Sequence, residues 1–253
     1  MRNVTTRTLL ALALILGSGS SMANFHLMKV VEVFPGTAAA PNAQYVVIQM
    51  YSGGQNQVGG HQITVFDSAG TAVGGGTFTF AAAVGSGANQ AKILIATTEA
   101  QTFFNVTANL IMTPVLPAGG GKVCFDSSPI DCVAWGNYSG SATGVGTPFN
   151  APTGLVSGRA AIRRLDIAGS PTVLENADDT DVSANDFVLG TPAPRNNANV
   201  AGTIPPSTCM NGVIEGLEAC DDGNNNDNDA CSNTCTVVVQ AVGIFASGFE
   251  DSP

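Results

Sequence analysis

The start of the chain has the pattern of a secretory signal, and this feature constrains the fold more than any other. Arg2 and Arg7 make the beginning positive, an apolar run follows over residues 9–16, and Ser21-Met22-Ala23 supplies small residues at a cleavage point. Exported chains fold in an oxidising compartment, so we expect the six cysteines to pair as disulfides. The sequence therefore predicts a signal peptide over residues 1–23 and a secreted mature chain, located extracellularly, at the cell surface or in the periplasm.

The composition of the mature chain favours an all-β fold. Gly, Ala, Thr, Ser and Asn are abundant, and charged residues make up only 11% of the sequence. Few Lys and Glu disfavour long helices, whereas short strands joined by tight turns suit such a chain. Beyond the signal, no apolar run approaches the roughly 20 residues that a membrane-spanning helix needs. We expect a soluble β-protein without a membrane span.

The formal net charge of -10 is unevenly distributed along the chain. Residues 24–174 contain equal numbers of acidic and basic side chains. From Glu175 to the end of the sequence there are 13 acidic residues and a single basic residue, Arg195. Nucleic-acid binding requires clustered cations that replace phosphate counterions. This charge pattern therefore argues against nucleic acid as a partner, and the acidic C-terminal part favours calcium binding or solubility as its explanation.

Alternation of apolar and polar residues predicts a series of short strands and one helix. The clearest strand is Tyr45–Tyr51, with apolar residues on both faces. Further strands are expected over residues 25–35, 61–67, 77–80, 92–96, 122–126, 130–135 and 158–165. Residues 98–105 are expected to form a short helix capped by Thr97 or Thr98.

Two cysteines lie in one predicted hairpin. Its strands flank a turn centred on Ser128, which places Cys124 and Cys132 on the same side and within bridging range. We expect a cross-strand disulfide, and the alternative is a pair of buried free thiols. Trp135 in the second strand is expected in the core.

The order of these segments resembles the lamin-tail domain, an immunoglobulin-like β-sandwich of exported bacterial proteins. The resemblance covers nearly all of residues 24–199. It rests on Val30-Val31-Glu32-Val33, Gln44-Tyr45-Val46-Val47-Ile48, Gly60-His61 to Phe66-Asp67, Gly121-Lys122-Val123, Asp131 to Gly136, Ala161 to Leu165, Asn185-Asp186-Phe187 and Thr191 to Asn196. Gln44 and Val47 stand where the family usually carries glutamates. The resemblance implies a binding or spacer module and supplies no catalytic residues.

A second resemblance follows a linker expected over residues 200–208. Residues 209–235 are similar to the cysteine-rich repeat of exported myxobacterial proteins, which is itself similar to Notch-type calcium modules. The matching residues are Cys209-Met210-Asn211-Gly212, Glu215, Glu218, Cys220 to Asn224, Asp229, Cys231-Ser232 and Cys235. The segment after it, residues 236–253, contains Ile244 to Glu250, which resembles a short tail of exported proteobacterial proteins; a sorting tag is one hypothesis for that tail, and a flexible end with two exposed aromatics is the other.

The cysteine-rich repeat has too few large apolar groups to fold on burial alone. Two disulfides among Cys209, Cys220, Cys231 and Cys235 are expected to supply the missing stability, and the sequence leaves their pairing open. The spacing lacks the two short knuckles of a structural zinc site, so zinc is the weaker alternative.

Oxygen-bearing side chains gather within the same repeat. Calcium takes six to eight oxygen ligands in loose geometry, and Gly223 allows the loop to turn sharply. The candidate calcium ligands are Asp221, Asp222, Asn224, Asp227 and Asp229. The alternative is a solvated acidic loop, because the spacing is not that of an EF-hand.

No motif in the sequence assembles a nucleophile with a base. The mature chain lacks a Gly-x-Ser-x-Gly elbow, and His26 and His61 do not form a zinc-protease pair. We therefore expect a non-enzymatic binding or structural module whose partner is an unknown protein or cell-surface ligand. The alternative is a secreted hydrolase, or an accessory subunit of one, using carboxylates within residues 178–186, although a loop of surface acids is the default interpretation of that segment.

Overall fold

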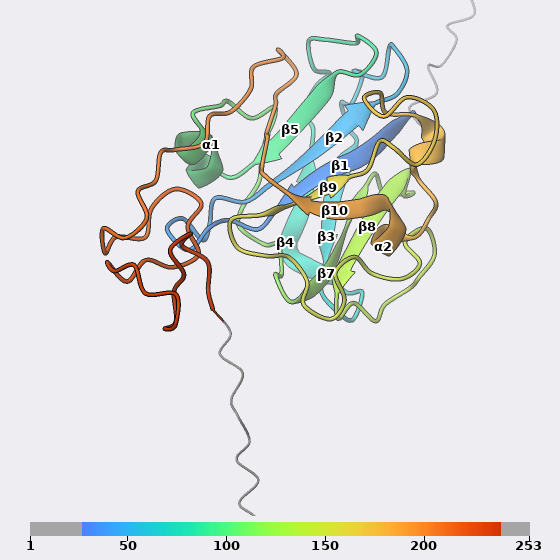
Figure 1. The fold of residues 1–253 in the computed structure, drawn as a ribbon. Helices are drawn as coiled ribbons and strands as arrows, with labels where there is room; N and C mark the ends of the chain where they lie inside the picture. Colours follow the sequence, from blue (N-terminus) through green and yellow to red (C-terminus); the bar gives the residue numbers. More distant parts are fainter. Residues whose placement is uncertain (1–26, 239–253) are drawn as a thin grey trace, which may run out of the picture.

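The computed structural model describes residues 27–238, and over that range the chain forms ten strands with little helix (Figure 1). The strands are β1 (Met28–Phe34), β2 (Tyr45–Met50), β3 (Gln62–Phe66), β4 (Ala72–Thr79), β5 (Lys92–Ala96), β6 (Leu110–Ile111), β7 (Gly120–Phe125), β8 (Asp131–Gly136), β9 (Ala160–Arg163) and β10 (Phe187–Gly190). The helices are α1 (Thr98–Phe104), the 3-10 turn η1 (Asn176–Asp178) and α2 (Ser183–Asp186). The signal peptide expected over residues 1–23, His26, and the tail from residue 239 lie outside the described residues.

The strands form two sheets that pack face to face. One sheet has the order β10-β9-β1-β2-β5-β6, antiparallel except for the short β5–β6 pair, and the other has the order β4-β3-β7-β8. Figure 1 shows the two sheets stacked, with α1 at one end of the first. The predicted all-β sandwich followed by a disulfide-stapled module is therefore confirmed.

The core lies between the two sheets, and a second apolar cluster covers the outer face of the larger sheet. Val46 and Ile48 of β2 point into the main core, whereas Tyr45 and Val47 point into the second cluster beside Phe104 of α1. All six residues of β2 are buried, as the sequence predicted for a strand with two apolar faces. Complete burial of one such side chain contributes about 1.5–3 kcal/mol, so this strand is a major source of stability.

The structure confirms the predictions that depend on neighbouring residues in the sequence, namely the helix cap and the disulfide-bonded hairpin. Thr97 caps α1, and its Oγ1 accepts a hydrogen bond of 3.0 Å from the backbone N–H of Ala100. In the β7–β8 hairpin, Cys124 faces Cys132 and the two form a disulfide with a Cα–Cα distance of 4.1 Å. Trp135 is fully buried. The predicted strand over residues 77–80 is part of a longer one, β4, which begins at residue 72.

The segment that follows β10 returns along the sandwich instead of leaving it. Buried Glu32 of β1 accepts hydrogen bonds from the Tyr45 hydroxyl and, at 2.7 Å, from the backbone N–H of Ala193. Farther on, the backbone N–H of Thr203 donates to the carbonyl of Phe104 at 2.7 Å. These contacts attach the Pro-rich segment to the body before the cysteine-rich module begins.

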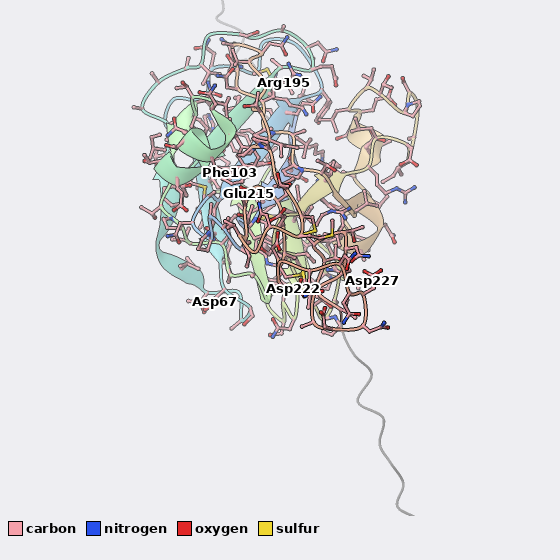
Figure 2. The ribbon with its side chains drawn as sticks, turned by 60° about the vertical axis from the view of Figure 1, so that its left-hand side comes forward. Asp67, Phe103, Arg195, Glu215, Asp222 and Asp227 are labelled. Atoms are coloured by element: carbon pink, nitrogen blue, oxygen red, sulfur yellow. A yellow bond between two sulfur atoms is a disulfide. The ribbon has the colours of Figure 1, made fainter. Side chains whose placement is uncertain are left out.

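The module lies beside one end of the sandwich and contains no strand or helix among its described residues (Figures 1 and 2). Disulfides join Cys209 to Cys235 and Cys220 to Cys231. In residues 27–238, no helix has the length and hydropathy of a bilayer-crossing segment.

Candidate functional site

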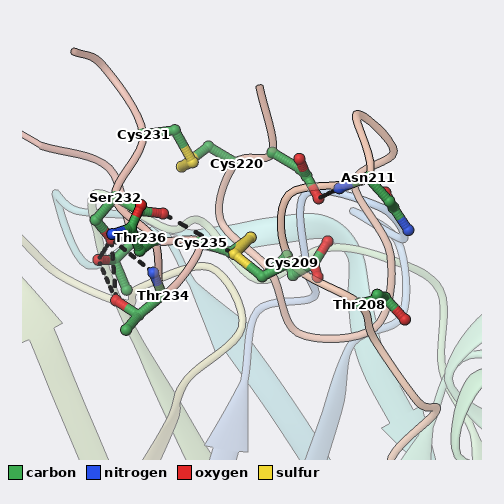
Figure 3. Close-up of a disulfide and its surroundings, with 12 residues drawn as sticks. Thr208, Cys209, Asn211, Cys220, Cys231, Ser232, Thr234, Cys235 and Thr236 are labelled. Carbon is green, nitrogen blue, oxygen red and sulfur yellow. Dashed lines mark hydrogen bonds between the residues drawn. A yellow bond between two sulfur atoms is a disulfide. The ribbon is translucent and has the colours of Figure 1, made fainter. Parts of the chain in front are cut away.

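The two module disulfides are nested, linking the first cysteine to the fourth and the second to the third (Figure 3). Their Cα–Cα distances are 5.6 and 5.8 Å, within the ordinary range for disulfides. Hydroxyls of Ser232, Thr234 and Thr236 hydrogen-bond to one another beside the outer bridge. The pairing that the sequence left open is thus resolved.

Three of the five predicted calcium ligands come together. The Asp229 carboxylate accepts a hydrogen bond from the backbone N–H of Cys231 at 3.2 Å, and the side chains of Asn224 and Asp222 lie beside it. These contacts, that of Cys231 foremost, lower the pKa of Asp229. The result is a compact set of oxygen donors at the surface of the module.

The other two predicted ligands are turned toward protein groups. Asp221 accepts backbone hydrogen bonds from Gly212 at 2.9 Å and Gly223 at 2.8 Å, which closes the loop around it. Asp227 accepts from the backbone and the side-chain amide of Asn233, at 2.7 and 2.9 Å. Both carboxylates therefore stabilise the conformation of the loop through hydrogen bonds to protein groups.

A further carboxylate in the module, Glu218, was not among the predicted ligands. Its side chain is buried, and Oε2 accepts from the backbone N–H of Glu215 at 2.9 Å. The other oxygen, Oε1, is buried with no hydrogen-bond partner among the described residues. Carboxylate oxygens of Glu218 and Asp221 and the sulfur of Cys235 lie within 4.8 Å of one another, but the disulfide leaves only the two carboxylates as cation ligands. Oε1 is therefore the oxygen of Glu218 that the described residues leave without a hydrogen bond.

A second cluster of charged side chains lies inside the sandwich, around Arg163 at the end of β9. The guanidinium is fully buried, and its NH2 group lies 2.8 Å from Oδ2 of Asp131 in β8. Its NH1 group lies 3.3 Å from Asp179 and 3.8 Å from Asp186. The same side chain donates from Nε to the carbonyl of Val30 at 2.8 Å, so one arginine connects both sheets to the acidic loop.

Lys29 of β1 completes this buried charge cluster. Its Nζ lies 2.5 Å from Oδ2 of Asp179 and 3.9 Å from Oδ1 of Asp131. Burial raises the pKa of Asp131 to about 7, against the attraction of Arg163, whereas the charge of Arg163 and the hydrogen bond from Lys29 outweigh burial and hold the pKa of Asp179 well below its usual value. Two adjacent carboxyl groups with opposite shifts behave as a pair that shares one proton.

The expectation that residues 178–186 form a loop of surface acids is wrong. Asp186 is buried and the Asp179 carboxylate is only 7% exposed, because Lys29 and Arg163 provide counter-charges from β1 and β9. Asp178 is buried too, and its carboxylate accepts hydrogen bonds from the backbone N–H groups of Ala168 and Glu175. Asp186 also accepts hydrogen bonds from the Thr180 backbone and hydroxyl. No feature of the loop sequence itself indicates these partners.

Two concave surfaces adjoin the features described above. A pocket of about 310 Å³ lies over the buried charge cluster and is lined by Lys29, Asp131, Asp179, Asp181 and Lys122 among others. A larger groove of about 650 Å³ lies where the sandwich meets the module. Its lining comes from both parts, including Val156 and Arg159 of the sandwich and Leu217 and Val237 from the module side.

No protein-family model, curated protein or solved structure matches this chain.

Proposed function

We propose that this chain is an exported, non-enzymatic binding or structural protein whose C-terminal cysteine-rich module takes up calcium. The observation that carries the proposal is the buried Oε1 atom of Glu218, which has no hydrogen-bond partner among the described residues, in a side chain with a carboxylate oxygen within 4.8 Å of one from Asp221. A buried carboxylate oxygen without a partner is unfavourable by about 1–3 kcal/mol or more. A bound cation would remove that penalty.

Calcium suits the donors of the module better than other metals do. The side chains of Asp222, Asn224 and Asp229 offer oxygen only, and every cysteine of the module is consumed in a disulfide. Hard cations with flexible coordination prefer such donors, whereas zinc and copper favour sulfur and nitrogen. The similarity of residues 209–235 to Notch-type modules agrees with this assignment.

The β-sandwich supplies the binding or structural part of the proposal. Its resemblance to lamin-tail domains implies a spacer or binding role, and three disulfides fit a protein that works in an oxidising environment outside the cytosol. The groove between sandwich and module is the largest concave surface described above, and we assign it to an unknown protein or cell-surface ligand.

Calcium dependence is tested by thermal unfolding of the purified full chain with calcium or with a chelator. A transition assigned to residues 209–235 should move to higher temperature with calcium, by the equivalent of about 2.7 kcal/mol at a hundredfold excess over the dissociation constant. Glu218→Gln should remove this shift. Asp166→Asn, at an exposed sandwich carboxylate, should retain it. If the midpoint temperature of the module transition is the same with calcium and with chelator, the proposal is contradicted.

A secreted hydrolase is the second candidate, and one observation favours it. Asp131 and Asp179 are carboxyl groups with oppositely shifted pKa values that line one pocket, an arrangement that suits acid–base catalysis. Both are, however, already bound to Arg163 and Lys29. Turnover of ester, peptide or glycoside substrates that is lost in Asp131→Asn would establish this candidate, and the absence of turnover in the wild-type chain would reject it.

A further inference from the structure

Three side chains from distant parts of the sequence meet in the buried charge cluster: an amine, a carboxyl group beside it, and a second carboxyl group that contacts both. Lys29 comes from β1, Asp131 from β8, and Asp179 from the turn that follows η1. We propose that Lys29 and Asp179 condense into an intramolecular amide bond, with Asp131 transferring the protons. The bond would be a permanent cross-link within the sandwich.

The geometry places an amine against a carboxyl group with a second acid beside both. Nζ of Lys29 is 2.5 Å from Oδ2 of Asp179, within hydrogen-bonding distance. Asp131 hydrogen-bonds to Asp179, and its Oδ1 lies 3.9 Å from the same Nζ. Groups held together in this way react as though at very high local concentration.

The surroundings exclude most water from the three groups. The side chains of Lys29, Asp131 and Asp179 are 10%, 1% and 7% exposed. The attraction of Asp131 and Asp179 outweighs the desolvation of Lys29, and that of Arg163 and Lys29 outweighs the desolvation of Asp179, so both groups are charged before the reaction. Condensation to a neutral amide removes both charges from this poorly hydrated place.

Asp131 has the acidity that a proton carrier needs. Its pKa of about 7, raised by burial, allows it to hold or release a proton near neutral pH. The other charged groups that face the pair are Arg163, which contacts both carboxyl groups, and Asp186, which contacts Arg163. Arg163 keeps the cluster compensated after the lysine charge is lost.

The condensation balances without an oxidant, a reductant or a cofactor. The Lys29 ammonium passes one proton to Oδ2 of Asp179, and the resulting amine attacks the carboxyl carbon to form the new C–N bond. The Asp131 carboxylate accepts a second proton from the nitrogen and passes it to the same Oδ2, which leaves as water when its C–O bond breaks. Oδ1, held 3.3 Å from NH1 of Arg163, stays as the amide oxygen and its developing charge is stabilised there.

The pocket over the cluster gives the released water a route to solvent, since it is lined by all three reacting side chains. The product joins residues 150 positions apart and ties the first strand to the acidic loop. A cross-link of that span restricts the unfolded chain strongly, as a long-range disulfide does. For an exported chain, it would resist unfolding even where disulfides are reduced.

Intact mass spectrometry of the denatured, reduced full chain tests the proposal directly. The wild-type chain should be lighter than its mature sequence by the mass of one water molecule. Proteolysis should yield one branched peptide that contains Lys29 and Asp179. A wild-type chain with the full sequence mass overturns the proposal and leaves an ordinary buried ion pair.

Variants separate the roles of the three groups. Lys29→Arg retains the positive charge without a condensing amine, so it should have the full sequence mass, and Asp131→Asn should have the full mass because it has no carboxyl group to carry the proton. Lys122→Arg, in the same pocket but on the rings of Phe66 and Tyr138, should still lack one water. A cross-link that persists in folded Asp131→Asn contradicts the role of Asp131, and one that persists in Lys29→Arg contradicts the bond itself.

Discussion

The sandwich and the cysteine-rich module belong to one chain, yet different forces hold them together. The sandwich buries Ile48, Ile93 and Val123 completely between its sheets. In the module, by contrast, Val213 is 58% exposed and Met210 44% exposed, while the cysteines Cys231 and Cys235 are buried. Burial of apolar surface is therefore the main source of stability in the first region, whereas disulfides are the main source in the second.

The two regions also differ in how their buried charged groups are paired. The sandwich surrounds Asp131 and Asp186 with the charges of Arg163 and Lys29, so its acids are paired inside the protein. The module leaves one oxygen of buried Glu218 without a protein partner. We conclude that the sandwich is complete as a folded unit, whereas the module depends on sulfur and, by our proposal, on a cation from outside.

The strongest test of the sandwich side of this comparison is Arg163→Met. The change removes the guanidinium that compensates three carboxylates, so the free energy of unfolding of the sandwich should fall by about 3–5 kcal/mol. Denaturant titration measures this loss. In the control, Arg164→Met, an exposed pair with Asp166 is lost, and the change should stay within about 0.5 kcal/mol. Equal losses of unfolding free energy in both variants would show that the buried cluster stabilises the sandwich no more than an exposed ion pair does.

Removal of disulfides should affect the two regions unequally. Replacement of Cys220 and Cys231 by Ser removes about 2–4 kcal/mol from a module that has almost no core, so residues 209–235 should lose their fold. Replacement of Cys124 and Cys132 by Ala opens a loop of comparable length, with a separation of 8 against 11 residues, within a packed hairpin. That variant should stay folded. Amide exchange followed by NMR measures both, and a folded module without its bridge would contradict the comparison.

The pH dependence of stability should have opposite signs in the two regions. In the sandwich, the pKa of Asp131 is raised by burial from 3.8 to about 7, so the folded state binds more protons than the unfolded state between those values. Stability of the sandwich should therefore fall as pH rises through that window, by up to about 1.4 kcal/mol per unit of pH. Asp131→Asn should flatten the curve measured by denaturant titration.

In the module, the Cys231 N–H and neighbouring side chains lower the pKa of Asp229. Its contribution to stability is present above the ordinary value of 3.8 and is lost as pH falls below it. Thermal unfolding of the module measured at a series of pH values tests whether its stability falls as the pH falls. A module that gains stability in acid, or a sandwich curve that Asp131→Asn leaves unchanged, would contradict the assignment of these groups.

The smallest expected effect concerns a local feature of the sandwich. Thr97→Ala removes the side-chain cap of α1 and should lower the free energy of unfolding by about 1 kcal/mol. Thr98→Ala, at the next position, leaves the cap intact and should change stability by less than about 0.5 kcal/mol. Thermal unfolding distinguishes the two. Equal effects would mean that the capping bond contributes nothing measurable.

Much of the fold was predictable because local chemistry decides it. The alternating pattern predicts β2, the threonine before an acidic first turn predicts α1, and the symmetric hairpin predicts the bridge between Cys124 and Cys132. The beginning of β4 was missed because Gly74, Gly75 and Gly76 are unfavourable in strands. These glycines lie in an irregularity of the β3–β4 ladder, and the pair of Ala72 with Phe66 beyond it extends the strand.

The candidate sites were only partly predictable. Composition indicated an oxygen-rich loop, but only the folded loop shows that Asp229 meets Asp222 and Asn224 while Asp227 is bound to Asn233. The cluster around Arg163 could not be predicted from the acidic loop, because Lys29 comes from a strand 150 residues before Asp179 in the sequence. Contacts over such separations depend on sheet order, which local patterns do not determine.

Hydrogen–deuterium exchange of the full chain, measured region by region before and after disulfide reduction, tests the central comparison most directly. We expect β1, β2 and β5 to keep their protection in reductant, while residues 209–235 lose theirs completely. Persistent protection of the reduced module, or a joint loss of protection in both regions, would contradict it.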